Sequence, residues 1–215
     1  MTAPARFLVV LDADSTLIEN EVIELLADAA GSLALVAAVT DQAMRGEIDF
    51  AESLRLRVKT LAGLSTDVFA EVGRLIRPTP GVQELIDGLH AHGSSVGVVS
   101  GGFHEVLDPL AATFGLDHWR ANRLEVADGR LTGGLVGPII DAAAKAEALR
   151  EWAALEGVPL RQAVAVGDGA NDLTMMRAAG LGIAFNAKPV VKAQADLAVD
   201  ARDLSQVLPI LGLRG

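Results

Sequence analysis

Four aspartates fall in two short polar segments that each follow an apolar run. Asp12 and Asp14 come directly after FLVVL, and Asp168 and Asp172 belong to GDGAND, which follows AVAV. Gathered in one crevice, these side chains would concentrate negative charge that is tolerable only beside a cation. Hard oxygen ligands select Mg²⁺. The aspartates therefore predict a magnesium site.

A second set of residues is suited to an anion. The segment SGGF provides the Ser100 hydroxyl and the Gly101 amide, and Lys145 provides a positive charge. Turns from strand to helix also present clustered amides, which suit phosphate. A metal and a phosphate side by side indicate phosphoryl transfer.

Each feature alone also has a structural explanation. Asp, Ser and Thr are favoured helix N-caps, and glycine pairs form tight turns. GDGAND is ordinary turn chemistry with Asp172 as an N-cap, and a single lysine on a helix is more often solvated. The joint placement of these segments, each behind its own strand, favours the chemical interpretation.

The elements that must position these residues alternate along the chain. Short aliphatic runs predict strands, and the stretches between them predict helices that glycine often ends. This alternation is typical of an α/β, Rossmann-like, doubly wound parallel sheet, in which ligands bind at the carboxyl ends of the strands. The expected strands are 7–11, 96–99, 163–166, 181–185 and 197–199, and the expected helices are 80–92, 103–114, 142–156 and 172–179.

Two segments depart from this alternation. Residues 17–79 contain several helical patterns and no strand, so we expect a helical cap inserted after the first strand, above the carboxylates. Residues 1–16 and 80–215 would then form the catalytic core. The segment RLEVADGRLTGGLVG contains Asp128-Gly129 between alternating runs, which predicts a small projecting β-hairpin.

Composition limits the class of protein. The chain has 215 residues, a net charge of −10 and no cysteine, so any metal must use oxygen or imidazole ligands. Its apolar runs are shorter than the ~18 to 20 residues of a membrane helix, and the first is too short for a signal peptide. We therefore expect a cytoplasmic protein. With no basic run, neither nucleic acid nor an anionic membrane is an expected partner.

The quoted motifs, in their order, resemble those of the haloacid dehalogenase superfamily. Within it, ENEVIE, MRGEIDFAESLRLRV, VVSGGF, ANRLEV and VAVGDGANDLTMM are similar to the phosphoserine phosphatase branch, and the similarity extends from Arg6 to about Leu208. Ala13 differs, since relatives often have a bulkier apolar residue there. That position should contribute only a backbone amide to the phosphate.

The resemblance implies roles for the motif residues. Asp12 would be the nucleophile that forms an aspartyl-phosphate, and Asp14 the general acid and then base, roles that suit two neighbouring carboxylates. Mg²⁺ would be held by Asp12, the backbone carbonyl of Asp14 and Asp168. Ser100, Gly101 and Lys145 would bind the phosphate. Asn171 and Asp172 would support the site, and Asn171 would also bind the substrate.

The resemblance also implies that the cap selects the substrate, O-phosphoserine. Glu21 would take the ammonium group and Arg57 the carboxylate, because guanidinium can grip a carboxylate with two hydrogen bonds. Met44 and Phe50 would form an apolar wall, or simply part of the core of the cap. The expected enzyme is a Mg²⁺-dependent phosphatase for the last step of serine biosynthesis, and a homodimer is left open.

Other functions remain to be separated from this one. A receiver-like phospho-acceptor also gathers aspartates, Ser or Thr and Lys around Mg²⁺, but it needs neither a cap nor a second carboxylate such as Asp14. A related enzyme could act on another small phosphomonoester, or transfer the phosphoryl group to an alcohol such as homoserine. A binding protein without activity is disfavoured, because every catalytic position is occupied.

Overall fold

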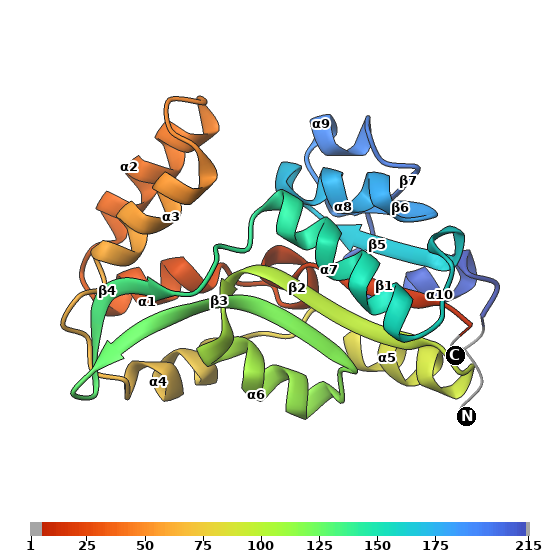
Figure 1. Ribbon diagram of the computed structural model, residues 1–215, viewed down its shortest axis with the longest axis horizontal. Helices are drawn as coiled ribbons and strands as arrows, with labels where there is room; N and C mark the ends of the chain where they lie inside the picture. Colours follow the sequence, from red (N-terminus) through yellow and green to blue (C-terminus); the bar gives the residue numbers. More distant parts are fainter. Residues whose placement is uncertain (1–5, 214–215) are drawn as a thin grey trace.

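A single seven-stranded sheet forms the centre of the protein, for which the computed structural model describes residues 6–213. Its strand order is β4-β3-β2-β1-β5-β6-β7, and neighbours run parallel except for the antiparallel pair β3 and β4 (Figure 1). This confirms the predicted α/β sheet. The strands are β1 Leu8–Leu11, β2 Ser95–Phe103, β3 His118–Ala127, β4 Arg130–Val136, β5 Ala163–Gly167, β6 Leu181–Phe185 and β7 Leu197–Val199.

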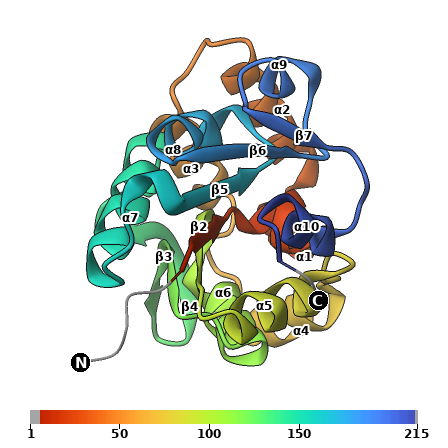
Figure 2. The same ribbon diagram turned by 90° about the vertical axis from the view of Figure 1, so that its right-hand side faces the viewer.

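Helices cover both faces of the sheet (Figure 2). Side chains alternate between the faces of a strand, so Val9 packs in the core beneath α5 and α6, and Val10 packs beneath α7 and α8. The sheet is therefore doubly wound, as predicted. The helices of this part are α5 Val82–Ala91, α6 His104–Phe114, α7 Ala142–Leu155, α8 Leu173–Ala178, α9 Pro189–Lys192 and α10 Val207–Ile210.

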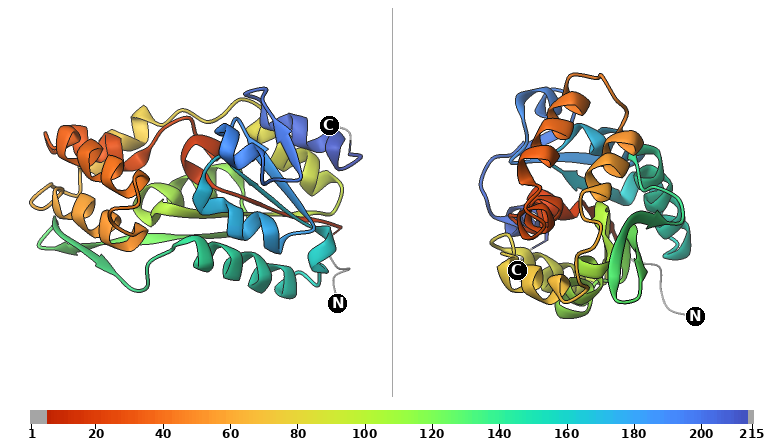
Figure 3. Two further views of the ribbon diagram at one scale, coloured as in Figure 1. Left: turned by 90° about the horizontal axis from the view of Figure 1, so that it is seen from above. Right: turned by 90° about the vertical axis from the view of Figure 1, so that its left-hand side faces the viewer.

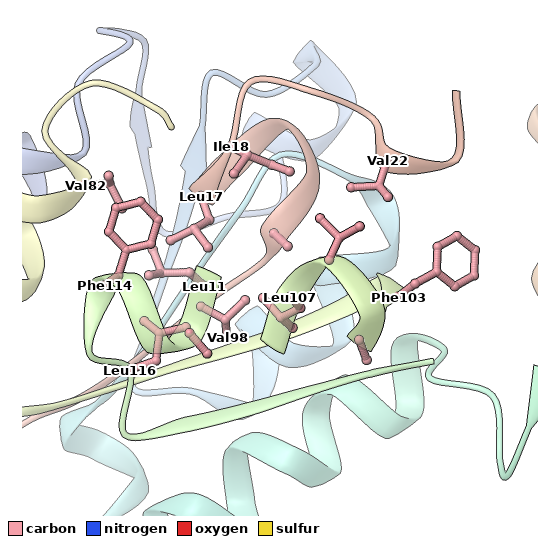
Figure 4. Close-up of a cluster of buried hydrophobic side chains, with 14 of the residues drawn as sticks. Leu11, Leu17, Ile18, Val22, Val82, Val98, Phe103, Leu107, Phe114 and Leu116 are labelled. Atoms are coloured by element: carbon pink, nitrogen blue, oxygen red, sulfur yellow. The ribbon is translucent and has the colours of Figure 1, made fainter. Parts of the chain in front are cut away.

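The apolar core fixes the end of the first strand. Figure 4 shows Leu11 and Val98 from the sheet beside Leu107 and Phe114 from α6, and all four side chains are buried. Leu17, which follows the tight turn after β1, is fully buried in the same cluster. Because apolar side chains hold both sides of this turn, the polar residues between them have a defined position.

Four helices occupy residues 17–79 (Figure 3). α2 and α3 form a pair beyond the carboxyl end of β1, whereas α4 lies beside α6. The two connections to the sheet run side by side, with Thr79 N donating to Leu17 O at 3.0 Å and a bridge between Ile18 and Pro78. These helices are α1 Val22–Ala29, α2 Leu33–Met44, α3 Phe50–Lys59 and α4 Val68–Leu75.

The predicted hairpin is present, and it is more than a projection. β3 begins at His118 as a parallel neighbour of β2, and only its second half pairs with β4. The hairpin tip also pairs with the helical insertion, since Gly63 N donates to Leu131 O at 2.8 Å and Leu131 N donates to Leu64 O at 2.9 Å. The sequence did not mark the first half of β3, because HWRAN lacks alternation.

Over residues 6–213, none of the helices is both long and apolar enough to cross a membrane.

Candidate active site

The polar segments singled out in the sequence meet at one edge of the sheet. They follow the neighbouring strands β1, β2 and β5, whose carboxyl ends lie beneath the helical insertion. A cavity of about 140 Å³ opens there between the sheet and α1 and α3. It is lined by Asp12, Asp14, Glu21, Ile23, Phe50, Leu54, Arg57, Ser100, Gly101, Gly102, Phe103, Asp168, Gly169 and Asn171.

A buried lysine links the two aspartate segments. Lys145 Nζ lies 2.7 Å from Asp12 Oδ1 and 2.7 Å from Asp172 Oδ1, and its side chain is 1% exposed. Burial by itself lowers the pKa of Lys145, but attraction to the two carboxylates is stronger and the pKa lies above its ordinary value. The lysine is therefore charged. The alternative interpretation of Lys145 as a solvated surface lysine is wrong.

Gly167 leaves room for the Asp172 side chain that contacts Lys145. A Cβ on Gly167 would overlap the Asp172 carboxylate, which lies under the end of β5. The second carboxylate oxygen of Asp172 accepts from Gly169 N at 3.1 Å. Asp172 is thus fully buried and held by both oxygens, which suits a supporting position.

Three carboxylates are arranged as a hard-oxygen site. One oxygen from each of Asp12, Asp168 and Asp172 lies within 4.8 Å of the others. Burial and the Asp172 charge raise the pKa of Asp12 to about 7, and the same two causes raise the pKa of Asp168 to about 6. Such crowding of like charges is relieved by a cation, so the donor set fits a hard divalent metal ion.

Asp14 has a different environment from Asp12. Its Oδ2 accepts from Val22 N at 3.4 Å, and its buried Oδ1 has no hydrogen-bond partner within residues 6–213. Burial, followed by the charges of Glu21 and Asp12, raises the pKa of Asp14 well above its ordinary value. A raised pKa favours the protonated carboxyl, and a protonated carboxyl that faces a cavity can act as a proton donor.

β2 ends in a bulge that carries the predicted anion-binding residues. Its pairing with β3 shifts between Val99 and Phe103, and this segment contains Ser100 and Gly101. Ser100 Oγ accepts from Gly102 N at 2.8 Å, which closes a small turn. The Ser100 hydroxyl and the glycine backbone line the cavity beside the turn that follows β1.

The helical insertion supplies the opposite wall. Glu21 and Arg57 both line the cavity, and over residues 6–213 no ion pair joins them. Ser15 Oγ donates to Glu21 Oε1 at 2.7 Å. Loss of surrounding water raises the pKa of Glu21 and lowers that of Arg57. Glu21 is exposed and Arg57 is half-buried, so both charged groups can be reached from the cavity.

The two predicted apolar residues of this wall have different outcomes. Phe50 lines the cavity, and its ring lies so close to Gly101 that a Cβ there would be 3.0 Å from Phe50 Cζ. The Met44 side chain lies outside the described part of the structure, so its assignment stays a prediction.

Some lining residues were not predicted from the sequence. Ile23 and Leu54 carry only the helical spacing of ordinary core positions, and Phe103 reads as a helix start. Asn122 was also overlooked, although it is 3% exposed and bonded to Gly101 O. Its sequence signal was its place in the motif ANRLEV, in which no single residue had been given a role.

Comparison with known proteins places this geometry in a family. The model of the haloacid dehalogenase-like hydrolases matches residues 9–177. The chain belongs to the haloacid dehalogenase-like hydrolases. Among solved structures, one described as a phospho-aspartyl intermediate analogue of phosphoserine phosphatase matches with a TM-score of 0.90 and 43% identity, over 96% of this chain and 99% of that one.

Curated members of this hydrolase family are also similar in sequence. A phosphoserine phosphatase of Streptomyces coelicolor is 56% identical over 97% of this chain, and one of Streptococcus thermophilus is 50% identical over 95%. The chain spans about half (51%) of the Streptomyces protein and 95% of the Streptococcus protein. The similarity to this branch that the motifs indicated is confirmed.

Proposed function

We propose that the chain hydrolyses O-phospho-L-serine to L-serine and phosphate through an aspartyl-phosphate on Asp12. The observation that carries this proposal is the cavity itself, which places Asp12 and Asp14 opposite Glu21 and Arg57. Phosphoserine has an ammonium and a carboxylate beyond its phosphate, so it matches a wall with one acid and one guanidinium. The similarity to phosphoserine phosphatases along nearly the whole chain supports the same substrate.

The first step would use Asp12 and Asp14 together. A carboxylate oxygen of Asp12 attacks phosphorus, and the bond from phosphorus to the serine oxygen breaks. Asp14 gives its proton to the departing serine oxygen. The raised pKa of Asp14 supports this role, because the protonated form is the one that can donate.

The second step would return the enzyme to its starting state. The Asp14 carboxylate takes a proton from a water molecule that attacks the phosphorus of the aspartyl-phosphate. The bond from phosphorus to Asp12 breaks, so inorganic phosphate leaves and Asp14 is again protonated. Splitting one displacement into two is the advantage of a covalent nucleophile.

The phosphate would be held between β2 and α7. We assign it to the Ser100 hydroxyl, the Gly101 amide and the Lys145 ammonium, with Asn171 in support. An ammonium group has three donors, and Asp12 and Asp172 use two of them. One donor therefore stays free for a phosphate oxygen.

Mg²⁺ is the cation that we assign to the acidic cluster. Asp12, Asp168 and the Asp14 backbone carbonyl would hold it, and Asp172 would keep its ion pair with Lys145. The ion would supply positive charge that offsets the phosphate oxygens and lowers the pKa values of Asp12 and Asp168. Oxygen ligands and the absence of cysteine and histidine in the cavity favour Mg²⁺ over softer metals.

We assign residues 17–79 to a cap that selects the substrate, and residues 1–16 and 80–215 to the catalytic core. In the cap, Glu21 would bind the ammonium and Arg57 the carboxylate of phosphoserine, with Phe50 and Met44 beside the short carbon chain. The proposed location is the cytoplasm and the proposed pathway is the last step of serine biosynthesis.

Phosphate release from a panel of phosphomonoesters tests the substrate. The panel contains O-phospho-L-serine, O-phospho-L-threonine, glycerol phosphate and an aryl phosphate, each with Mg²⁺ and with a chelator. We expect the highest kcat/KM for phosphoserine, and loss of turnover with the chelator. A higher value for a substrate without an ammonium and a carboxylate would contradict the assignment, and phosphoryl transfer to added homoserine would favour the phosphotransferase alternative.

A further inference from the structure

Asn122 joins the two halves of the anion site without lining the cavity. Its side chain is buried in β3, where Nδ2 donates to Gly101 O at 2.9 Å. Its Oδ1 accepts from Ile140 N at 2.9 Å. The partners fix the orientation of the amide, because a carbonyl needs a donor and an N–H needs an acceptor.

The first of these bonds compensates for the bulge in β2. Val99 pairs with Arg120, and the next pair is Phe103 with Asn122. β2 therefore advances by four residues over a stretch in which β3 advances by two. In the described sheet, neither β1 nor β3 pairs with Gly101. The Gly101 carbonyl would therefore lack a partner inside the protein, and the Asn122 amide provides one.

The second bond sets the start of α7. Ile140 precedes Asp141, whose side chain caps the helix by accepting from Ala144 N at 2.9 Å. Lys145 follows in the first turn, with Lys145 N donating to Asp141 O at 2.9 Å. The position of Ile140 is thus transmitted to Lys145 through one helical turn.

We propose that Asn122 is a positioning residue that fixes the spacing between the Ser100 and Gly101 bulge and Lys145, and through that spacing the affinity for phosphate. The inference rests on the proposed function in one respect: a phosphate group must bind in this cavity, whichever ester carries it. It adds a third element, β3, to the two that carry the phosphate ligands.

Two variants separate the two hydrogen bonds. Asn122→Asp keeps nearly the same volume and an acceptor for Ile140 N, but its ionised carboxylate cannot donate to Gly101 O. Asn122→Ala removes both bonds. The probe is inorganic phosphate, measured as an inhibitor of aryl phosphate hydrolysis in the presence of Mg²⁺.

We expect the inhibition constant of phosphate to rise roughly fivefold to tenfold in Asn122→Asp, which is the effect of one lost hydrogen bond, and at least as much in Asn122→Ala, which loses both. KM for the aryl phosphate should rise by a similar factor while kcat falls less, because the spacing affects bound phosphate before and during the reaction. A merely structural residue would lower the melting temperature and leave both constants of the folded protein unchanged.

Ser95→Ala is the matched control. Ser95 is also buried on β2, and its hydroxyl donates to Glu156 Oε2 at 2.9 Å, but it lies at the other end of the strand. This variant should lose stability and keep the wild-type inhibition constant. If both Asn122 variants bind phosphate within twofold of wild type, the positioning role is refuted.

The same experiment stays informative if the substrate proposal fails. Inorganic phosphate and an aryl phosphate carry neither an ammonium nor a carboxylate, so their binding does not depend on phosphoserine recognition. Wild-type protein that hydrolyses the aryl phosphate but not phosphoserine would contradict the proposed substrate. Unchanged phosphate binding in the variants would contradict the inference on Asn122 alone.

Discussion

The two ends of β2 contrast in how their charged side chains are compensated, although the buried Ser94 hydroxyl just before the strand has no hydrogen-bond partner among residues 6–213. At the start of the strand, Ser95 Oγ and His118 Nε2 both contact the Glu156 carboxylate, at 2.9 and 2.7 Å. The His118 ring stacks on Trp152 with 5.4 Å between centroids. The pairing there is regular, and Ser95 lies opposite Leu8 of β1.

At the other end of β2, the chain bulges and the polar groups are incompletely satisfied. In the described part of the chain, Asp14 Oδ1 lacks a hydrogen-bond partner, and the pKa values of Asp12 and Asp168 are raised by burial and by like charges. Buried polar groups in proteins are normally paired, and exceptions with perturbed pKa values cluster at functional sites. This contrast is the one expected if the first end contributes to stability and the second end binds the proposed phosphate and metal ion.

The largest effect is expected from the nucleophile. Asp12→Asn should fold normally but lose hydrolysis by roughly 10⁴-fold or more, because a neutral amide is a poor nucleophile. Phosphate release and circular dichroism measure the two properties separately. Turnover at the wild-type rate would refute the covalent mechanism.

Asp14 should have the next largest effect. Asp14→Asn removes the proton that protonates the serine oxygen, and we expect kcat to fall by ~10² to 10⁴. Steady-state kinetics with phosphoserine provide the test. A loss smaller than tenfold would assign proton transfer to water or to another residue.

Arg57 should affect recognition more than chemistry. Arg57→Ala should reduce kcat/KM for phosphoserine by about 10-fold to 150-fold, since hydrogen bonds to charged groups contribute ~1.5 to 3 kcal/mol. An aryl phosphate, which has no carboxylate, should be much less affected. Equal losses on the two substrates would show that Arg57 supports the cap in general, and an unchanged value for phosphoserine would refute its assigned role.

The smallest effect on activity is expected at the start of β2. Glu156→Ala leaves the Ser95 hydroxyl and the His118 ring without their shared partner, so we expect a loss of about 1 to 3 kcal/mol in unfolding free energy. Turnover at a temperature where the variant is folded should match wild type. Thermal unfolding measures the stability, and phosphate release measures the turnover. A tenfold loss of turnover would show that the ends of β2 are not independent.

Local patterns in the sequence were sufficient for most of the sheet, for the helices α5 to α8 and for the first residues of the site. The run ending at Leu11 followed by Asp12, and the segment GDGAND, combine an apolar strand with a polar turn in adjacent residues. Parallel strands bring such turns to one edge, so the convergence of Asp12, Ser100 and Asp168 follows from topology. The motifs themselves then indicated the family.

Other features were decided by contacts between segments distant in the chain. The tip of the β3 and β4 hairpin pairs with Gly63 and Leu64, which local alternation does not reveal. Ile23 and Leu54 have the spacing of core residues, and only the position of α1 and α3 above the sheet makes them part of the cavity wall.

By itself, the sequence determined which chemical groups the site contains, because residue types and short spacings specify carboxylates, a lysine and glycine turns. The tertiary structure alone decided that Lys145 is buried between Asp12 and Asp172, and that Asn122 ties Gly101 to Ile140. The physical reason is that pKa values and hydrogen bonds depend on neighbours within a few ångströms. Those neighbours lie between 18 and 133 residues away along the chain.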